Sequence, residues 1–455
     1  MHQRIITAIS RIRQDVASLL SPFLIHQTCE SLGHVWRECV LTPSAIIHVF
    51  IIQIIHGNTA LTNLRHLSGL GLTAQAFCDA RKRLPLEVFR LLLRRIVPTL
   101  RDGQEPPTLW LGRHRTFGID GSNFSMPDTP ELQREFGQPG NQRPGCGFPV
   151  AHFLAMFDSA TGYLMDILAF PLRTADFSKV ARIHPGLRAG DVLVGDRGFC
   201  SFVHVAQLVG LGIHGVFRLH QRLSLAVAGS PGSESTTHAK RKKRGNSKRS
   251  LAKVLRQLGV KDQVFEWHRP VRRPDWMTDE EFESLPTTLE CRVLSYDVSR
   301  PGYRTKRIDL LTTLLDAEAY PLEELAKLYC RRWQVEVNFR HLKITMNMDV
   351  LHCRTVDGVL KELMIFAIVY NLVCVVMVEA AGRQGVAVDR ISFIDALRWL
   401  VASGPGATLV NLIVNPSRPG RVEARVKKRR PKQFDLMSQP RCVLRNRLLG
   451  QGLVA

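Results

Sequence analysis

Acidic residues are scarce in this sequence. Only 40 Asp and Glu accompany 62 Lys and Arg among 455 residues, so the formal net charge is +22. Such an excess of cations favours a partner that carries many phosphates, and DNA and an anionic membrane are the two candidates. With 45% hydrophobic residues, the chain can bury a large core and is long enough for about two to four domains.

Several common motifs are also missing. No C-x-x-C pair occurs among the ten cysteines, so the sequence predicts neither a zinc ribbon nor a disulfide framework. No G-x-x-x-x-G-K loop is present, and nothing supports ATP hydrolysis. Residues 1–20 lack the continuous apolar run of a secretory signal. These absences together predict a cytoplasmic protein with reduced thiols.

Only residues 363–378 resemble a membrane segment. The run is shorter than the ~18 to 20 residues that a span needs, and it contains the polar Asn371. We therefore expect a buried core helix rather than a membrane span, and no membrane partner.

Hydrophobic periodicity predicts a mixed α/β fold. Residues 1–100 have helical spacing, with Pro85 dividing one long helical segment in two. From Thr116 the period changes to two, and the expected order is three strands, helix, strand, helix, strand, in one mixed sheet covered by helices. Six cations of the helical segment are expected to contact DNA phosphates, with a solvated helix face as the alternative: Arg81, Lys82, Arg83, Arg90, Arg94 and Arg95.

Changes in composition predict five parts of the chain. They are a helical DNA-binding domain at 1–105, the first part of a catalytic core at 106–220, a β-rich insertion with a basic mobile loop at 221–320, the second part of the core at 321–405, and a basic tail at 406–455.

Residues 329–343, YCRRWQVEVNFRHLK, contain a single carboxylate among four Arg or Lys residues. A helix turns about 100° per residue, which would place five polar side chains on one stripe. They are Tyr329, Arg332, Glu336, Arg340 and Lys343. The simplest explanation is an i,i+4 ion pair of Glu336 with Arg332 or Arg340, worth only tenths of a kcal/mol.

Two aspartates follow apolar segments and precede glycines. Asp120 lies in GIDGSNF, at the end of the first predicted strand, and Asp196 lies in VLVGDRGF, at the end of a later one. Each could simply cap a turn. However, carboxylates at strand ends are also suitable ligands for Mg²⁺.

Two strand-end aspartates and a helix-borne glutamate are what a two-metal phosphoryl-transfer site requires. Glu336 would then bind metal, and its cationic neighbours would hold phosphates through charge-assisted hydrogen bonds. The expected metal ligands are Asp120, Asp196 and Glu336, and the expected DNA contacts are Tyr329, Arg332, Arg340 and Lys343.

The same residues carry a resemblance to a known family. The spacing Y-x-x-R-x-x-x-E-x-x-x-x-x-x-K is similar to the signature of bacterial insertion-sequence transposases of the family 4 type. The blocks IDGSNFSMPDTPE, GCGFPVAHFLAMFDSATG and DVLVGDRGFCS resemble the family's sequences around its first two catalytic aspartates. The resemblance covers roughly residues 70–385.

The resemblance implies a DDE triad of Asp120, Asp196 and Glu336 on a ribonuclease H-like fold with a β-strand insertion. It also implies two Mg²⁺ ions, for which Mn²⁺ would substitute, and double-stranded DNA as both element end and target. A homodimer that bridges two ends, a hairpin intermediate and a nucleoid location follow from it too. Either Trp267 or Trp276 would stack on a flipped base, although a packing role is open for both.

Two other functions remain open from the sequence. A ribonuclease H-like nuclease would need the triad but not strand transfer, and an inactive DNA-binding protein would need only the charge.

Overall fold

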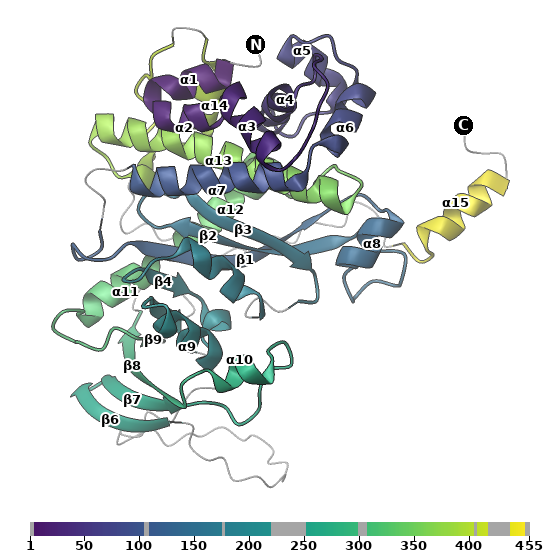
Figure 1. Cartoon of the computed structure of the whole chain (residues 1–455). Helices are drawn as coiled ribbons and strands as arrows, with labels where there is room; N and C mark the ends of the chain where they lie inside the picture. The colour runs from purple at the N-terminus through teal and green to yellow at the C-terminus, as the bar shows by residue number, and fades with distance from the viewer. Residues whose placement is uncertain are drawn as a thin grey trace. The chain divides into compact units, whose positions relative to one another are not determined.

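A computed structural model of the chain describes residues 4–103, 109–174, 178–219, 252–298, 307–404, 407–416 and 437–450. The chain forms two compact units. The first consists of Met1–Leu109, Asp120–Thr174 and Trp333–Ala455, and the second of Trp110–Ile119 and Ala175–Arg332. The predicted mixed α/β class with a helical N-terminal region is confirmed (Figure 1).

The N-terminal part of the first unit is helical. Its helices are α1 (Arg4–Ile12), α2 (Gln14–Leu19), α3 (Pro22–Ser31), α4 (Pro43–Ile55), α5 (Leu64–Ser68), α6 (Ala74–Arg83) and α7 (Leu86–Asp102). Ser21, Thr42 and Thr73 each accept a hydrogen bond from the first turn of the helix that follows. As predicted, Pro85 separates α6 from α7.

The predicted DNA contacts on these helices are not alike. Arg81 is 8% exposed and its guanidinium lies over the Phe50 ring, 4.6 Å from the centroid, so the prediction of a phosphate contact is wrong for Arg81. Arg90 and Arg94 both pair with Glu87. Arg83 is exposed.

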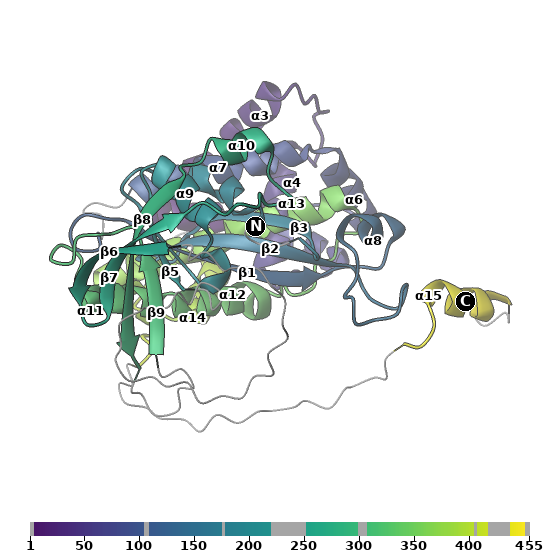
Figure 2. The same cartoon turned by 90° about the horizontal axis from the view of Figure 1, so that it is seen from below.

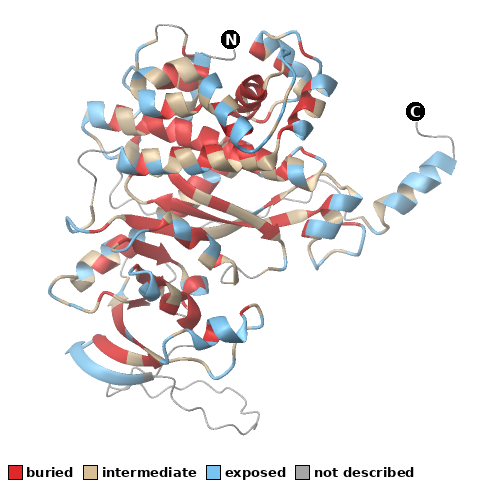
Figure 3. Ribbon diagram, in the orientation of Figure 1, coloured by how far each residue is buried: buried red, intermediate tan, exposed pale blue. Residues whose placement is uncertain are grey.

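The core of the first unit is built around α13 (Val356–Gln384), which contacts α4, α7, β3 and α14 (Phe393–Ala402). By length and composition α13 could cross a membrane, but 89% of its most apolar window is buried inside the protein (Figure 3). Asn371 on this helix donates to the carbonyl of Leu164 at 2.9 Å and accepts from its N–H at 2.8 Å. The predicted core helix is confirmed, although it is longer than the apolar run.

Three strands of the first unit are ordered β3-β2-β1. They are β1 (Thr116–Ser125), β2 (Val150–Asp158) and β3 (Leu164–Pro171), with α8 (Pro130–Phe136) between β1 and β2 in the chain. The β2–β3 hairpin was predicted, and Asp158 closes its turn by accepting from the N–H groups of Ala160 and Thr161. The residues of β1 before Asp120 belong to the second unit.

In the second unit, the start of β1 pairs in parallel with β4 (Val192–Gly195), and β4 pairs in parallel with β5 (His214–Arg218). Helix α9 (Phe202–Gly210) connects β4 to β5. The helix predicted around 176–184 is instead the short 3₁₀ helix η3 (Val180–Gly186), which contains Pro185 and therefore lacks one helical N–H.

An antiparallel series continues this sheet in the order β5-β9-β8-β7-β6, which can be followed from β9 to β6 in Figure 1. Figure 2 shows the same strands from below. The strands are β6 (Ala252–Gly259), β7 (Asp262–His268), β8 (Thr288–Asp297) and β9 (Arg307–Thr312), and α10 (Asp279–Glu283) lies between β7 and β8 in the chain. Strands β7, β8 and β9 were predicted, whereas β6 was not. The predicted basic loop lies outside the described residues.

Candidate active site

The parallel strands β4 and β5 end at the same edge of the second unit's sheet. Gly195, the last residue of β4, is paired with Phe217, and Asp196 and Arg218 are the next residues along their strands. Asp196 caps the short 3₁₀ helix η4 (Arg197–Phe199), and its Oδ1 accepts a hydrogen bond of 2.7 Å from the Gly198 N–H. Among the described residues, no donor contacts Oδ2. The predicted position of Asp196 at a strand end is therefore confirmed.

Helix α11 (Leu322–Arg331) brings Tyr329 to this edge. Pro321 is its N-cap residue, and Leu325, Leu328 and Tyr329 form a buried cluster with Val194 and Val216 of β4 and β5. These two valines precede Asp196 and Arg218 by two residues, so Tyr329 lies close to the strand ends.

The electrostatics of Tyr329 confirm this neighbourhood. Burial raises the pKa of the Tyr329 phenol above its ordinary value, and the Asp196 carboxylate raises it further. The guanidinium groups of Arg332 and Arg218 act on the same pKa in the opposite direction. The Arg332 guanidinium lies 6.0 Å from the Tyr329 ring centroid. One carboxylate, one neutral phenol and two guanidinium groups therefore share this edge.

Arg218 was not among the residues expected from the sequence. In the sequence, Arg218 is marked only by its position after the apolar residues of HGVFR. The parallel pairing of β5 with β4, which brings it near Asp196, depends on tertiary structure and cannot be inferred from that segment.

Asp120 lies within a strand rather than at its end, so that part of the sequence-based description is wrong. Strand β1 pairs with β4 only over Thr116–Gly118, and then continues through Ser125. Gly121 extends the strand instead of turning it, and its N–H donates to Asp120 Oδ1 at 2.8 Å. Asp120 is nevertheless just past the last residue that pairs with β4.

Lys343 contacts the same strand in the first unit. Its Nζ donates to the hydroxyl of Ser122 at 3.3 Å and pairs with Asp349 at 3.2 Å. Ser122 and Asp120 are two residues apart and project from the same face of β1. The structure therefore places Lys343 beside the strand face that carries Asp120.

Glu336 lies on α12 (Trp333–Arg340), which packs against β2. Phe339 makes edge-on ring contacts with Phe153 and Phe157 at centroid distances of 5.4 and 5.7 Å. Glu336 is half-buried, three residues before Phe339, and Arg340 is exposed at the end of the helix. Because β2 neighbours β1, Glu336 and Asp120 are carried by neighbouring elements of one unit.

The single helix predicted through residues 329–343 is wrong. This segment instead consists of the end of α11, then α12 and the π-helical turn η6 (His341–Thr345). Arg332 separates α11 from α12, and its N–H donates to the carbonyl of Tyr329, three residues earlier in the chain. A uniform 100° per residue does not apply across this break or through a π turn. The boundary between the two units falls directly after Arg332.

No complete carboxylate cluster lies within either unit. Asp120 and Glu336 belong to the first unit and Asp196 to the second. Within the described parts of the chain, neither unit gathers three or more His, Cys, Asp or Glu side chains that could hold a metal ion.

The two tryptophans considered for base stacking differ in exposure. Trp267 on β7 is 3% exposed, with its ring against Phe202, so it is a core residue. Trp276 is half-buried against Val203, Met277 and Phe282.

Residues 112–372 match the model of a protein family described as Transposase DDE domain. This range is more than half of the chain and contains all three predicted carboxylates. The chain belongs to this family of DDE transposases. It is therefore a DNA transposase, an enzyme that cuts DNA and transfers strands, and enzymes of this kind depend on divalent metal ions.

A curated relative supports the same assignment. The transposase InsG for insertion sequence element IS4 of Escherichia coli (strain K12) is 23% identical over 382 residues, which cover 79% of this chain and 77% of that protein. The predicted resemblance to insertion-sequence transposases is thus confirmed, whereas the Tyr-Arg-Glu-Lys signature itself is not tested by these matches.

Among solved structures, the transposase resembles a piggyBac transposase synaptic complex with hairpin DNA. The similarity covers 87% of this chain and 81% of that one, with 11% sequence identity and a TM-score of 0.46.

Proposed function

We propose that this transposase cuts at the ends of an insertion sequence and joins them to target DNA, with Asp120, Asp196 and Glu336 as ligands of two Mg²⁺ ions. The supporting observation is that Asp196 directly follows a parallel strand and lies near Tyr329, Arg218 and Arg332, inside the region that matches the family. Side chains that can bind phosphate lie near this carboxylate, and this arrangement favours a role in phosphoryl transfer over a role in a surface ion pair.

The side chains present fit such metal ions. All three are carboxylates, which provide the hard oxygen ligands that Mg²⁺ prefers, and Mn²⁺ takes similar ligands. Asp196 retains Oδ2 for a ligand while Oδ1 is held by Gly198. When bound, the ions would lower the pKa of the attacking water and stabilise the leaving oxygen.

The remaining residues would hold and orient DNA. Tyr329, whose pKa is raised, stays protonated at neutral pH and donates its O–H to a phosphate oxygen. Arg332 and Arg218 would bind the same phosphate by charge, with the guanidinium geometry suited to two oxygens. Lys343 and the exposed Arg340 would contact phosphates of the DNA backbone near Asp120.

At a coarser level, we propose a ribonuclease H-like core at 106–220 and 321–405 with a β-rich insertion at 221–320, preceded by a DNA-binding helical domain at 1–105 and followed by a basic tail at 406–455. The enzyme would act at the nucleoid in the cytoplasm, as a homodimer when it bridges two element ends. A net charge of +22 suits contact with long stretches of DNA.

The test uses the full-length protein and a duplex that carries an element end. Asp120→Asn, Asp196→Asn and Glu336→Gln should each abolish cleavage yet retain DNA binding, because each removes a metal ligand rather than a phosphate contact. Asp275→Asn, at an aspartate whose side chain is 90% exposed, is the matched control and should cut normally. Wild-type cleavage by any of the three variants would disprove its assignment.

Metal dependence provides a second measurement on the same protein. Cleavage should occur with Mg²⁺ or Mn²⁺, fail in excess EDTA, and be slow with Ca²⁺, which is larger and less demanding in geometry. Undiminished cleavage in EDTA would contradict the two-ion proposal.

A further inference from the structure

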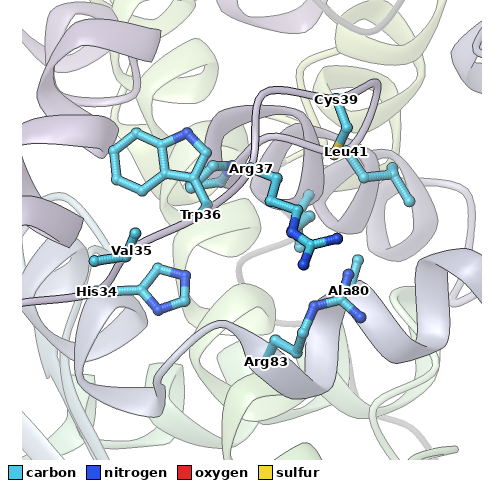
Figure 4. Close-up of a pocket in the computed structure, with 10 residues that line it drawn as sticks. His34, Val35, Trp36, Arg37, Cys39, Leu41, Ala80 and Arg83 are labelled. Carbon is cyan, nitrogen blue, oxygen red and sulfur yellow. The ribbon is translucent and has the colours of Figure 1, made fainter.

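A cavity of about 580 Å³ lies in the helical part of the first unit, and its lining contains no residue assigned above to catalysis. Its wall is the segment between α3 and α4, together with the start of α4 and the end of α6 (Figure 4). The lining residues are His34, Val35, Trp36, Arg37, Cys39, Leu41, Pro43, Ile46, Ala80 and Arg83. The volume lies in the range of small-molecule sites, about 300 to 1,000 Å³.

The lining combines cations with an apolar floor. Arg37 and Arg83 are exposed, come from different elements, and turn their guanidinium groups toward the same opening (Figure 4). Ile46 and Ala80 are buried and supply the apolar surface of the lining that is called the floor here. The described lining contains no carboxylate, so the cavity is suited to an anion and not to a metal cation.

Aromatic rings form another side of the cavity. The Trp36 indole and the His34 imidazole are nearly parallel, at 22°, with centroids 6.3 Å apart. His26 also contacts the indole, at a centroid distance of 4.9 Å and an angle of 45°. The Trp36 Nε1–H donates to Glu38 at 3.2 Å, which fixes the ring without using its face.

Buried contacts hold the two walls in place. The N–H of His34 donates to the carbonyl of Cys29 at 3.0 Å, which ties the segment to the end of α3. Lys361 is 1% exposed, and its Nζ donates to the carbonyls of Arg81 and Lys82 at 3.2 Å each. A buried cation at the carboxyl end of α6 stabilises the turn that presents Arg83.

We propose that this cavity binds one nucleotide of the DNA element end, with its phosphate held by Arg37 and Arg83 and its base against Trp36. The identity of the DNA as an element end rests on the proposed function, whereas the binding of a nucleotide rests on the chemistry of the cavity. Two guanidinium groups recognise one phosphate well, and an aromatic face accepts any base. An inorganic anion would use the cations but neither the apolar floor nor the indole.

Cys39 provides a direct probe, because its thiol is exposed and lines the cavity. Full-length protein is alkylated with N-ethylmaleimide, with and without a saturating duplex that carries the element end, and the rate at each cysteine is measured by mass spectrometry. DNA should slow labelling of Cys39 at least about fivefold. Cys442 is also exposed but lies outside the cavity, and it should react at an unchanged rate.

The variants separate a nucleotide site from general electrostatics. Arg37→Ala and Arg83→Ala should each weaken binding of the duplex that carries the element end. At the DNA concentration that saturates the wild-type protein, Cys39 of each variant should therefore be labelled again. Trp36→Ala should weaken binding without changing its salt dependence. The matched control, Arg65→Ala, removes an exposed cation of the same helical region that does not line the cavity, and it should retain protection.

Three results would overturn the proposal: full labelling of Cys39 on saturating DNA, equal protection by inorganic phosphate alone, or equal weakening by Arg65→Ala. Failure of this proposal can be distinguished from failure of the proposed catalytic residues. The Asp120→Asn protein, which should not cut, should still protect Cys39, and a wild-type protein that cuts without protecting Cys39 would disprove the cavity while leaving the triad intact.

Discussion

Asp196 uses one carboxylate oxygen to cap a turn and leaves the other available. The hydrogen bond from Gly198 fixes the orientation of the carboxylate at the edge of the sheet. Capping and metal binding are therefore compatible in one residue, although the sequence presents them as alternatives. Capping is confirmed, and metal binding remains a prediction.

Gly198 is a sensitive position because of this hydrogen bond. A Cβ at residue 198 would lie 2.9 Å from Asp196 Oδ1, so Gly198→Ala should displace the carboxylate while leaving the exposed backbone intact. We expect kcat for DNA cleavage to fall about tenfold or more, since small displacements of a catalytic group are costly, with the thermal unfolding temperature nearly unchanged. Gly210→Ala, where a Cβ meets nothing within 4 Å, is the control and should cut at the wild-type rate. Wild-type kcat in Gly198→Ala would show that the orientation of Asp196 is unimportant.

Arg332 and Lys343 distinguish a phosphate site from ordinary ion pairs. If they contact DNA, Arg332→Ala and Lys343→Ala should each lower the magnitude of the slope of log K against log salt by about one unit and reduce cleavage. Filter-binding titrations across salt measure this slope. Arg272→Ala, at a side chain that is 87% exposed, provides the comparison for loss of a surface cation. Unchanged slopes with normal cleavage would favour the simple ion-pair explanation.

At the level of elements, apolar periodicity predicted the helices and strands whose burial is regular. Strand β2 and helix α13 are examples, because six consecutive residues at the end of β2 are buried and α13 is buried on every face over most of its length. Strand β6 escaped prediction because its described residues are exposed, so its sequence lacks the alternation of a half-buried strand. The break at Arg332 escaped because its backbone stays in the helical region, and no Pro or Gly marks it.

A buried ion pair fixes the β-rich part of the second unit. Arg292 on β8 is 1% exposed, donates through Nε to Asp262 Oδ1 at 2.8 Å, and also donates to the carbonyl of Tyr320 at 2.8 Å. It thereby joins β7 and β8 to Tyr320, which precedes the N-cap residue Pro321 of α11.

Removing one partner of this pair should be costly. Asp262→Asn leaves the Arg292 charge uncompensated, and we expect a loss of about 3 to 5 kcal/mol in local stability. Peptide-resolved hydrogen exchange of β7 and β8 measures it. Asp297→Asn removes the exposed partner of Lys261 from the same sheet and should leave exchange unchanged. Equal exchange in both variants would show that the buried pair has no special structural role.

At the level of the whole molecule, the sequence indicates which carboxylates to select as candidates but not how the chain arranges them. Asp120, Asp196 and Glu336 could be selected because carboxylates with those flanking residues resemble a family pattern. That β1 runs through Asp120, that Arg218 lies beside Asp196, and that the three carboxylates come from two units all depend on strand pairing and packing between distant segments. Contacts between distant segments produce no local pattern from which a single sequence could predict them.

Buried neutral histidines in both units should make the whole protein sensitive to mild acid. Burial lowers the pKa of His184 to about 4, and burial together with the neighbouring His184 lowers the pKa of His204 to about 3. In the first unit, burial and Arg340 lower the pKa of His341 to about 4. These imidazoles stay neutral in the folded protein at pH values where the unfolded chain, with pKa values near 6.5, binds protons.

The sign of the effect follows from linkage. Below about pH 6.5 the unfolded state takes up protons that the folded state does not, so the free energy of unfolding falls with pH until about pH 4. At pH 5 each fully buried imidazole accounts for about 2 kcal/mol of this loss.

Urea unfolding at pH 7 and pH 5 should show a lower midpoint at pH 5, and His184→Leu should reduce the difference. The control, His268→Leu, replaces an imidazole that is 43% exposed and should keep the wild-type difference. A midpoint independent of pH between 7 and 5 would mean that these histidines are protonated, or solvated, in the folded protein.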